Sequence, residues 1–188
     1  MKRWKITFNS PVVLGFVFVS LIVMVVNILN LGKSNELLFM TYHSSLTNPL
    51  TYVRVFTHVL GHSGWGHYIG NATYILLLGP MLEEKYGSKR ILQIILITAV
   101  VTGVVNYVFF WNVALCGASG VVFAFILLTS FTSFKNGEIP LTFIMVAVVF
   151  IGQQVYDAVL LHDNISNLSH ILGGIVGSVV GYSLNKKR

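Results

Sequence analysis

Charged side chains, and above all acidic ones, are scarce in this sequence of 188 residues. Asp, Glu, Lys and Arg together make up 10% of the chain, with six acidic residues against twelve basic ones. A single cysteine, Cys116, excludes an internal disulfide and a cysteine-based metal cluster. Apolar residues are in excess at 55%, and the mean hydropathy is +0.78. This balance predicts a protein whose solvent is lipid and excludes an ordinary soluble globule.

Basic residues outnumber acidic ones, but their distribution argues against a nucleic-acid ligand. The formal net charge is +6. The basic residues stand at the ends of apolar runs and form no basic patch interleaved with aromatic residues, as a nucleic-acid surface would require. We therefore predict no nucleic-acid partner.

Six apolar runs have lengths suited to crossing a membrane, for which about 20 residues are needed. They are residues 12–31, 67–82, 91–110, 117–134, 140–161 and 168–184. The second and the last are short, so we expect local thinning of the bilayer or partial burial in protein. The first follows a basic start that resembles a signal peptide. It is longer than a typical signal core and has no small-x-small cleavage site after it, so we interpret it as a retained helix.

The positions of the basic residues predict the orientation of these runs. Ten of the twelve lie before the first run, after the last, between runs two and three, or between runs four and five, and only Lys33 and Arg54 lie elsewhere. Because cytoplasmic loops are enriched in Lys and Arg, we predict an all-α membrane protein. It would be a bundle of six transmembrane helices with cytoplasmic N- and C-termini, in one domain over residues 1–188. Short loops favour a bacterial cytoplasmic membrane.

Polar side chains gather at one end of the second, fourth and sixth runs. These runs open with HSGWGHYIGN, GASG and NLSHILGG. In the predicted topology all three helices enter from outside, so their first residues share one depth near the external face. Polar side chains inside a bilayer are costly and usually face a bundle interior or a water-filled cavity. Their convergence predicts a functional site.

Residue types at this depth indicate nucleophilic catalysis. Ser119 needs a base to become a nucleophile, and His170 is the base that the topology sets level with it. Asn71 and His67 are four residues apart on one helix face, and both can donate a hydrogen bond to an oxyanion. The backbone N–H of Ser119, at a helix N-terminus, is a third donor.

No carboxylate fits as a third catalytic group. Asp157 and Asp163 are expected outward of the site, near the end of the fifth run. We therefore predict a Ser–His dyad.

Glycines are spaced so that the fourth and sixth helices can touch. Gly173, Gly177 and Gly181 form one smooth stripe, and Gly117 and Gly120 offer a matching surface. Small-residue stripes let membrane helices approach closely. Close approach of these two helices would bring Ser119 within reach of His170.

Taken together, these motifs resemble the rhomboid intramembrane serine proteases over residues 52–181. The matching patterns are GxSG at residues 117–120, H-x4-H-x3-N ending at Asn71, E-x-x-x-G at residues 83–87, and H-x-x-G-x-x-x-G from His170. The resemblance implies Ser119 as nucleophile, His170 as base, and His67, Asn71 and the Ser119 amide as oxyanion donors. Residues expected to support the site are His62, Gly117, Gly120 and Gly173.

The resemblance also implies a reaction and its partners. The expected activity is endopeptidase cleavage of transmembrane segments in single-pass membrane proteins, within a lipid bilayer and without cofactor or metal. The sequence assigns no oligomeric state.

Three positions depart from the usual pattern of that family. Its Trp-Arg pair is Val53-Arg54 here, so the first loop would keep an arginine at the membrane interface without its aromatic anchor. Cys116 replaces a frequent glycine before GxSG, which could narrow the substrate pocket. Phe123, one helical turn after Ser119, would fill the place of an aromatic residue, often tyrosine, beneath the histidine.

Other functions stay open at this point. The serine and glycines could serve packing alone, and His62, His67 and His170 could bind zinc, although no H-E-x-x-H occurs. A non-catalytic protein that binds transmembrane helices would suit the same bundle. A transporter would be expected to show an inverted repeat, and none is found.

The outer end of the fifth run also has two interpretations. It carries Gln153, Gln154, Tyr156 and Asp157. These residues could simply meet water or lipid headgroups. Alternatively, as the resemblance implies, the fifth helix and residues 162–166 form a gate that admits a substrate helix.

Overall fold

A computed structural model describes residues 5–132, 138–160 and 164–185 of the chain. Its described residues are predominantly helical. The α-helices are α1 (Pro11–Leu29), α2 (Pro49–Thr57), α3 (Trp65–Tyr86), α4 (Ser88–Phe109), α5 (Ser119–Ser130), α6 (Leu141–Leu160) and α7 (Asn164–Asn185). A π-helical turn, η1 (Asn35–Phe39), and a 3-10 turn, η2 (His58–Leu60), lie in the segment between α1 and α3.

Each of the six apolar runs corresponds to one long helix. The matching helices are α1, α3, α4, α5, α6 and α7. Judged by length and hydropathy, α1 and α4 are the only helices within the described ranges that are long and apolar enough to cross a membrane. Apolar stretches of 12 residues in α5 and 14 residues at the start of α6 are shorter. The all-helical class is confirmed, while the six crossings remain a prediction.

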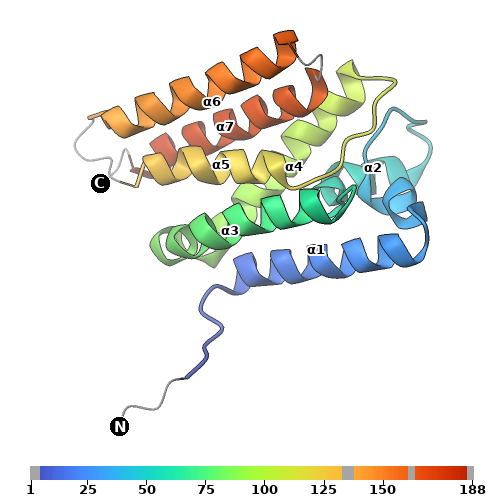
Figure 1. The fold of residues 1–188 in the computed structure, drawn as a ribbon, viewed down its shortest axis with the longest axis horizontal. Helices are drawn as coiled ribbons and strands as arrows, with labels where there is room; N and C mark the ends of the chain where they lie inside the picture. Colours follow the sequence, from blue (N-terminus) through green and yellow to red (C-terminus); the bar gives the residue numbers. More distant parts are fainter. Residues whose placement is uncertain (1–4, 133–137, 161–163, 186–188) are drawn as a thin grey trace.

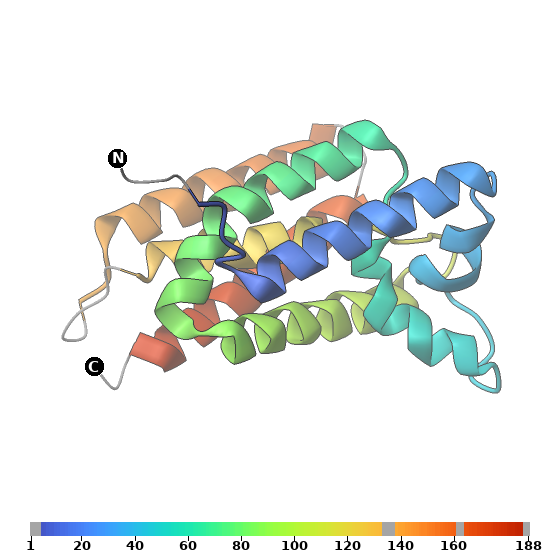
Figure 2. The ribbon, with the colours of Figure 1, turned by 90° about the horizontal axis from the view of Figure 1, so that it is seen from below.

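Successive long helices run in alternating directions. Figures 1 and 2 show α1 beginning and α7 ending at the same end of the bundle, with α1 and α6 at opposite edges in Figure 1. Helix α5 lies in the interior, where it contacts α3, α4, α6 and α7. Its side chains Val121, Ala124, Phe125 and Leu128 are fully or almost fully buried. The helix that begins at Ser119 is therefore enclosed by its neighbours.

A buried carboxylate joins the start of α1 to the end of α3. Oxygens of Glu83 accept hydrogen bonds from the backbone N–H groups of Val12 and Val13 at 3.0 Å, and one accepts from the Ser88 hydroxyl at 2.6 Å. The first N–H groups of a helix have no intrahelical partner, and the helix dipole favours an anion there. Glu83, the first residue of the E-x-x-x-G motif, thus anchors α1.

The segment between α1 and α3 is folded against one end of the bundle. Asn27 in α1 accepts hydrogen bonds from the Ser34 hydroxyl at 3.1 Å and the Asn35 backbone N–H at 3.0 Å. The Asn35 amide in turn donates to the carbonyl of His62 at 2.9 Å. This chain of buried polar contacts holds the first loop beside the start of α3.

Arg54 is buried within the first loop. Its side chain is 3% exposed. The guanidinium donates to the Tyr42 hydroxyl at 2.5 Å and the Ser44 hydroxyl at 3.0 Å, and it lies 4.3 Å from the centre of the Tyr42 ring. A buried cation must be compensated by hydrogen bonds, so Arg54 holds the first loop together.

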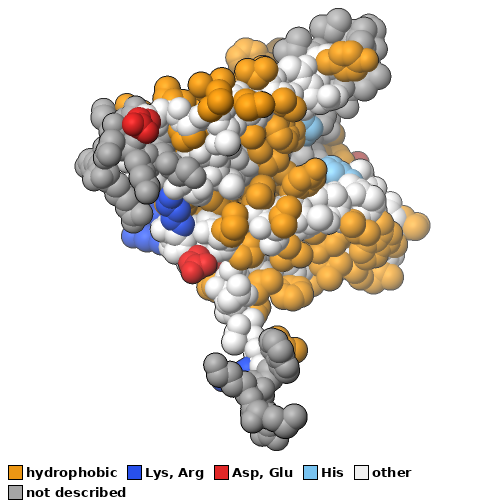
Figure 3. Space-filling model, turned by 60° about the vertical axis from the view of Figure 1, so that its left-hand side comes forward, with side chains coloured by type: hydrophobic (Ala, Val, Ile, Leu, Met, Phe, Trp, Pro, Cys, Tyr) orange, Lys and Arg blue, Asp and Glu red, His pale blue; other side chains and the backbone are white. Residues whose placement is uncertain are grey.

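Apolar side chains dominate the outer surface of the long helices. Figure 3 shows hydrophobic side chains spread over one described face, with the visible Lys and Arg toward its left and the visible histidines toward its right. In α1, Ile22 and Leu29 are 62% and 78% exposed. An apolar exterior of this extent is what a lipid solvent would favour.

Candidate active site

Residues from α3, α5 and α7 meet around one cavity of about 330 Å³. Ser119 is the first residue of α5, and His170 lies in the second turn of α7. His67 and Asn71 line the same cavity from α3, beside Phe123 from α5. The structure therefore brings together the four residues to which the sequence assigned the chemistry.

The turn before Ser119 depends on a glycine. Gly117 has φ +125°, a conformation that L side chains rarely adopt, and an added Cβ would lie 2.5 Å from the His67 ring. Its backbone N–H donates to the carbonyl of His58 at 2.9 Å. Thr41 and Leu115 form an antiparallel bridge just upstream, with N···O distances of 2.9 and 2.8 Å. The first loop thus fixes the chain that leads into Ser119.

Close contact between α5 and α7 sets the distance between serine and histidine. A Cβ added at Gly173 would lie 2.0 Å from the carbonyl oxygen of Gly120. The two backbones can approach this closely only because a glycine stands at residue 173. His170 is three residues before Gly173, and Ser119 directly precedes Gly120. The predicted contact between the two glycine-bearing helices is confirmed.

His170 is held by an aromatic ring and by a carboxamide. The Phe123 ring stacks on the imidazole with centroids 4.3 Å apart and an interplanar angle of 4°, as expected from its place one turn after Ser119. Phe150 from α6 contacts Phe123 edge-on, with ring centroids 4.7 Å apart. Nδ1 of His170 lies 2.7 Å from Oε1 of Gln154, also from α6.

Hydrogen-bond donors lie on the α3 side of the cavity. Nδ1 of His67 is 3.1 Å from the Ser63 hydroxyl, which orients the ring against Gly117. Nδ2 of Asn71 is buried and has no hydrogen-bond partner among the described residues. The backbone N–H of Ser119, as the first of α5, is outside the intrahelical hydrogen bonds. These are the donors that the sequence assigned to an oxyanion.

His62 lies behind this wall. Its ring is 1% exposed, contacts His67 edge-on at 5.0 Å, and has Nδ1 3.2 Å from the carbonyl of Leu60. Burial, and then the neighbouring His67, lower the pKa of His62 to about 4. Nε2 of His62, Nδ2 of Asn71 and the Ser20 hydroxyl, all without partners in the described part of the chain, line a cavity of about 10 Å³. His62 therefore supports His67 mainly by packing.

His58 is a structural histidine. It is 1% exposed, with Nδ1 3.0 Å from the carbonyl of Val55 and Nε2 3.1 Å from the Thr102 hydroxyl. Burial lowers the pKa of His58 to about 4. A neutral ring in this place connects α2 to α4, while its carbonyl holds Gly117.

Cys116 lies next to the site without being suited to react. It is half-buried, and burial raises the pKa of the thiol to about 11. Because the thiolate is the reactive form of cysteine, this side chain stays a neutral thiol at physiological pH. In the described ranges, no group of three His, Cys, Asp or Glu side chains is arranged to hold a metal ion.

Two contacts at the site were missed by inference from the sequence. Gln154 was noted only as a polar residue at the outer end of the fifth run, and Ser63 only as part of HSGWGH. A glutamine within an apolar helix was the available signal. The side chains of Asp157, Asp163 and residues 162–166, where one of the two interpretations places a gate, lie outside the described residues.

Known proteins resemble this chain over most of its length. A sequence model of the Rhomboid domain matches residues 49–187. The chain is 26% identical over 163 residues to Rhomboid protease GlpG of Haemophilus influenzae. The aligned region covers 84% of this chain and 83% of that protein. It is also 30% identical over 138 residues to Rhomboid-related protein 1 of Caenorhabditis elegans. Here the aligned region covers 69% of this chain but only 39% of that protein.

Proposed function

Because the chain belongs to the Rhomboid family of membrane proteins, we propose that it is a serine endopeptidase that cuts peptide bonds within the membrane. The observation that carries this proposal is the single cavity lined by Ser119, His170, His67 and Asn71. A nucleophile, a base and hydrogen-bond donors around one space are the groups that acyl transfer requires.

The proposed placement in the bilayer has α1, α3, α4, α5, α6 and α7 as six crossings of one domain. The start of α1 and the end of α7 would face the cytoplasm, together with the basic residues Lys85, Lys89 and Arg90. The apolar exterior and the common end of α1 and α7 support this placement. The catalytic cavity would then lie near the external face, where water can enter it.

In the first half of the proposed reaction, Oγ of Ser119 attacks the carbonyl carbon of the scissile peptide. Nε2 of His170 takes the hydroxyl proton as the new C–O bond forms. The tetrahedral intermediate carries its negative charge on the former carbonyl oxygen. Donors from His67, Asn71 and the Ser119 backbone would stabilise that oxyanion.

In the second half, the C–N bond breaks and His170 gives its proton to the leaving amine. The acyl group remains as an ester on Ser119 until a water molecule attacks it. His170 takes a proton from this water and returns one to Oγ, which restores the enzyme. His170 thereby carries a proton from Ser119 to the leaving amine and then one from water to Ser119, without a metal or a cofactor.

The proposed substrates are transmembrane segments of single-pass proteins. In lipid, a helix satisfies its peptide groups internally, so a peptide bond is accessible only where the substrate helix unwinds. Residues that weaken a helix near the cut site are therefore expected to favour cleavage.

A fluorophosphonate probe tests for an activated serine. Purified protein in detergent would be treated with the probe beside Ser119→Ala and His170→Ala, and the adduct would be located by intact and peptide mass. We expect an adduct on Ser119 that both variants lose. A single-pass reporter in liposomes should be cleaved by the unmodified protein alone.

The same assay distinguishes a non-catalytic relative. Folded, unmodified protein that neither reacts with the probe nor cleaves the reporter, but still binds it, would instead be a helix-binding membrane protein. In that case the GASG turn and the glycine stripe would serve packing only.

A further inference from the structure

The hydrogen bond between Gln154 and His170 connects the candidate base to a helix that carries none of the other candidate catalytic residues. Ser119, His67, Asn71 and His170 belong to α3, α5 and α7. Gln154 belongs to α6, which packs on α5 and α7 at the edge of the bundle. From its amide oxygen to Nδ1 of His170 the distance is 2.7 Å.

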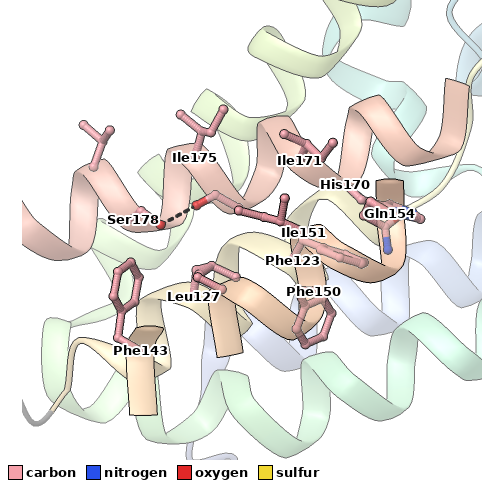
Figure 4. A pocket seen from close by; sticks show the side chains of 13 residues that line it. Phe123, Leu127, Phe143, Phe150, Ile151, Gln154, His170, Ile171, Ile175 and Ser178 are labelled. Carbon is pink, nitrogen blue, oxygen red and sulfur yellow. Dashed lines mark hydrogen bonds between the residues drawn. The ribbon is translucent and has the colours of Figure 1, made fainter. Parts of the chain in front are cut away.

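This contact lies in apolar surroundings. Gln154 is 5% exposed. Figure 4 shows its side chain beside His170 at one end of a cavity of about 190 Å³, whose other labelled lining residues are apolar except for Ser178. A buried amide is costly without a partner, and a hydrogen bond in low dielectric is stronger than one in water. The geometry therefore favours a persistent bond.

We propose that Gln154 is a positioning residue that orients His170 for proton transfer by accepting a hydrogen bond from its Nδ1–H. In a neutral imidazole, one ring nitrogen carries the proton and the other accepts. A carbonyl-type oxygen beside Nδ1 stabilises the tautomer in which Nδ1 is protonated. Nε2 is then the acceptor that Ser119 requires.

The bond also restricts rotation of the ring. Phe123 lies parallel to the imidazole and limits its tilt, but a half-turn about the Cβ–Cγ bond would leave the ring in the same plane. A hydrogen bond to one ring nitrogen removes that freedom and directs the opposite nitrogen. Both contacts therefore restrict the orientation of His170.

The proposal rests on the proposed function, because orientation matters only if His170 acts as a base. It also assigns a consequence to the position of α6. The bond can form only while α6 stays packed against α7, so a displacement of α6 would remove the constraint on the base.

Substitutions of Gln154 separate orientation from simple packing. Gln154→Met keeps the length and removes the oxygen, and Gln154→Asn keeps the amide but is one methylene too short. Gln154→Glu keeps an oxygen at the same reach. Gln93→Met is the matched control, since Gln93 also accepts a hydrogen bond, from Arg90 at 2.9 Å, on the distant α4.

The first measurement is the second-order rate of adduct formation on Ser119 with the fluorophosphonate probe. We expect Gln154→Met and Gln154→Asn to react about 10- to 100-fold more slowly, a loss smaller than the ~10⁴ known for a carboxylate in the same role. Gln154→Glu and Gln93→Met should stay within about threefold of the unmodified protein. With a cleavable reporter, kcat should fall while KM is unchanged.

The second measurement is the tautomer of His170, from ¹⁵N spectra of histidine-labelled protein, with its signals assigned by their loss in His170→Ala. We expect the Nδ1-protonated form in the unmodified protein and in Gln154→Glu, and a shift toward the Nε2-protonated form in Gln154→Met and Gln154→Asn. Unchanged rates and tautomer in both of these variants would overturn the proposal. If the unmodified protein does not react, the proposed function fails, while the tautomer still decides whether Gln154 orients the ring.

Discussion

A methyl group added at Gly177 is expected to push α5 and α7 apart. An ideal Cβ at this residue would lie 2.1 Å from the carbonyl oxygen of Ala124. A close carbon–oxygen contact needs about 3.3 Å, so the shortfall is about 1.2 Å. Because both the new carbon and the oxygen are attached directly to helix backbones, no side-chain rotation relieves the overlap. The helices must separate, or one must bend.

The cost can be estimated from two opposing effects. Overpacking in a well-packed interior costs about 1–3 kcal/mol. Replacing glycine by alanine within a helix recovers about 0.5–1 kcal/mol. A net loss of about 1–2 kcal/mol is therefore expected for Gly177→Ala. Because His170 lies two turns before Gly177 in α7, a shift of about 1 Å would also misplace the base and slow the reaction of Ser119 by about 100-fold.

Gly174, about one helical turn before Gly177, provides the matched control. A Cβ at Gly174 would meet the Leu127 side chain at 3.7 Å, an ordinary contact, so Gly174→Ala should retain or raise stability. Thermal unfolding in one detergent should place Gly177→Ala about 5 °C or more below Gly174→Ala, and probe labelling should slow only in Gly177→Ala. Equal unfolding temperatures and equal rates would refute the inference that glycine packing positions the dyad.

Two further predictions concern an oxyanion donor and the buried histidines of the first loop. Asn71→Ala removes a buried donor assigned to the oxyanion and should lower kcat by about 10²- to 10³-fold, measured on a cleavable reporter; an unchanged kcat would exclude Asn71 from this role. Acid should destabilise the fold, because burial lowers the pKa of His58 and of His62 to about 4. Between pH 6.5 and 4 the unfolded chain binds more protons than the folded one, so stability is full above about pH 6.5 and is lost as pH falls through this window, by up to about 3 kcal/mol per histidine. Thermal unfolding from pH 8 to 4 measures this loss, which should shrink in His58→Gln, and an identical pH dependence in that variant would contradict the assignment to His58.

Patterns along the chain were enough to indicate the family, the helical class and the candidate site residues. Hydropathy marks where helices lie, and motif spacing marks which residues share a helix face or a turn. His67 and Asn71, four residues apart on one helix, would face one side in any arrangement of the bundle. The glycine stripe of α7 similarly specified which face of that helix approaches another. These inferences needed only the period of an α-helix.

The burial of Arg54 did not follow from the sequence, because its partners lie elsewhere in the loop. Tyr42 and Ser44 fold back so that their hydroxyls accept hydrogen bonds from its guanidinium. Burial of a charged side chain depends on partners that hydropathy does not identify.

What the sequence by itself determined is therefore the set of candidate residues: the proposed serine, the proposed histidine base and the proposed hydrogen-bond donors. Tertiary structure alone decided how each group is held. Examples are Gln154 on His170, the His58 carbonyl on Gly117 and Glu83 on the start of α1. Each of these contacts joins separate segments, and it depends on which helices are neighbours and how each is rotated about its axis. Rotation and neighbourhood result from packing over the whole bundle, and local periodicity does not encode them.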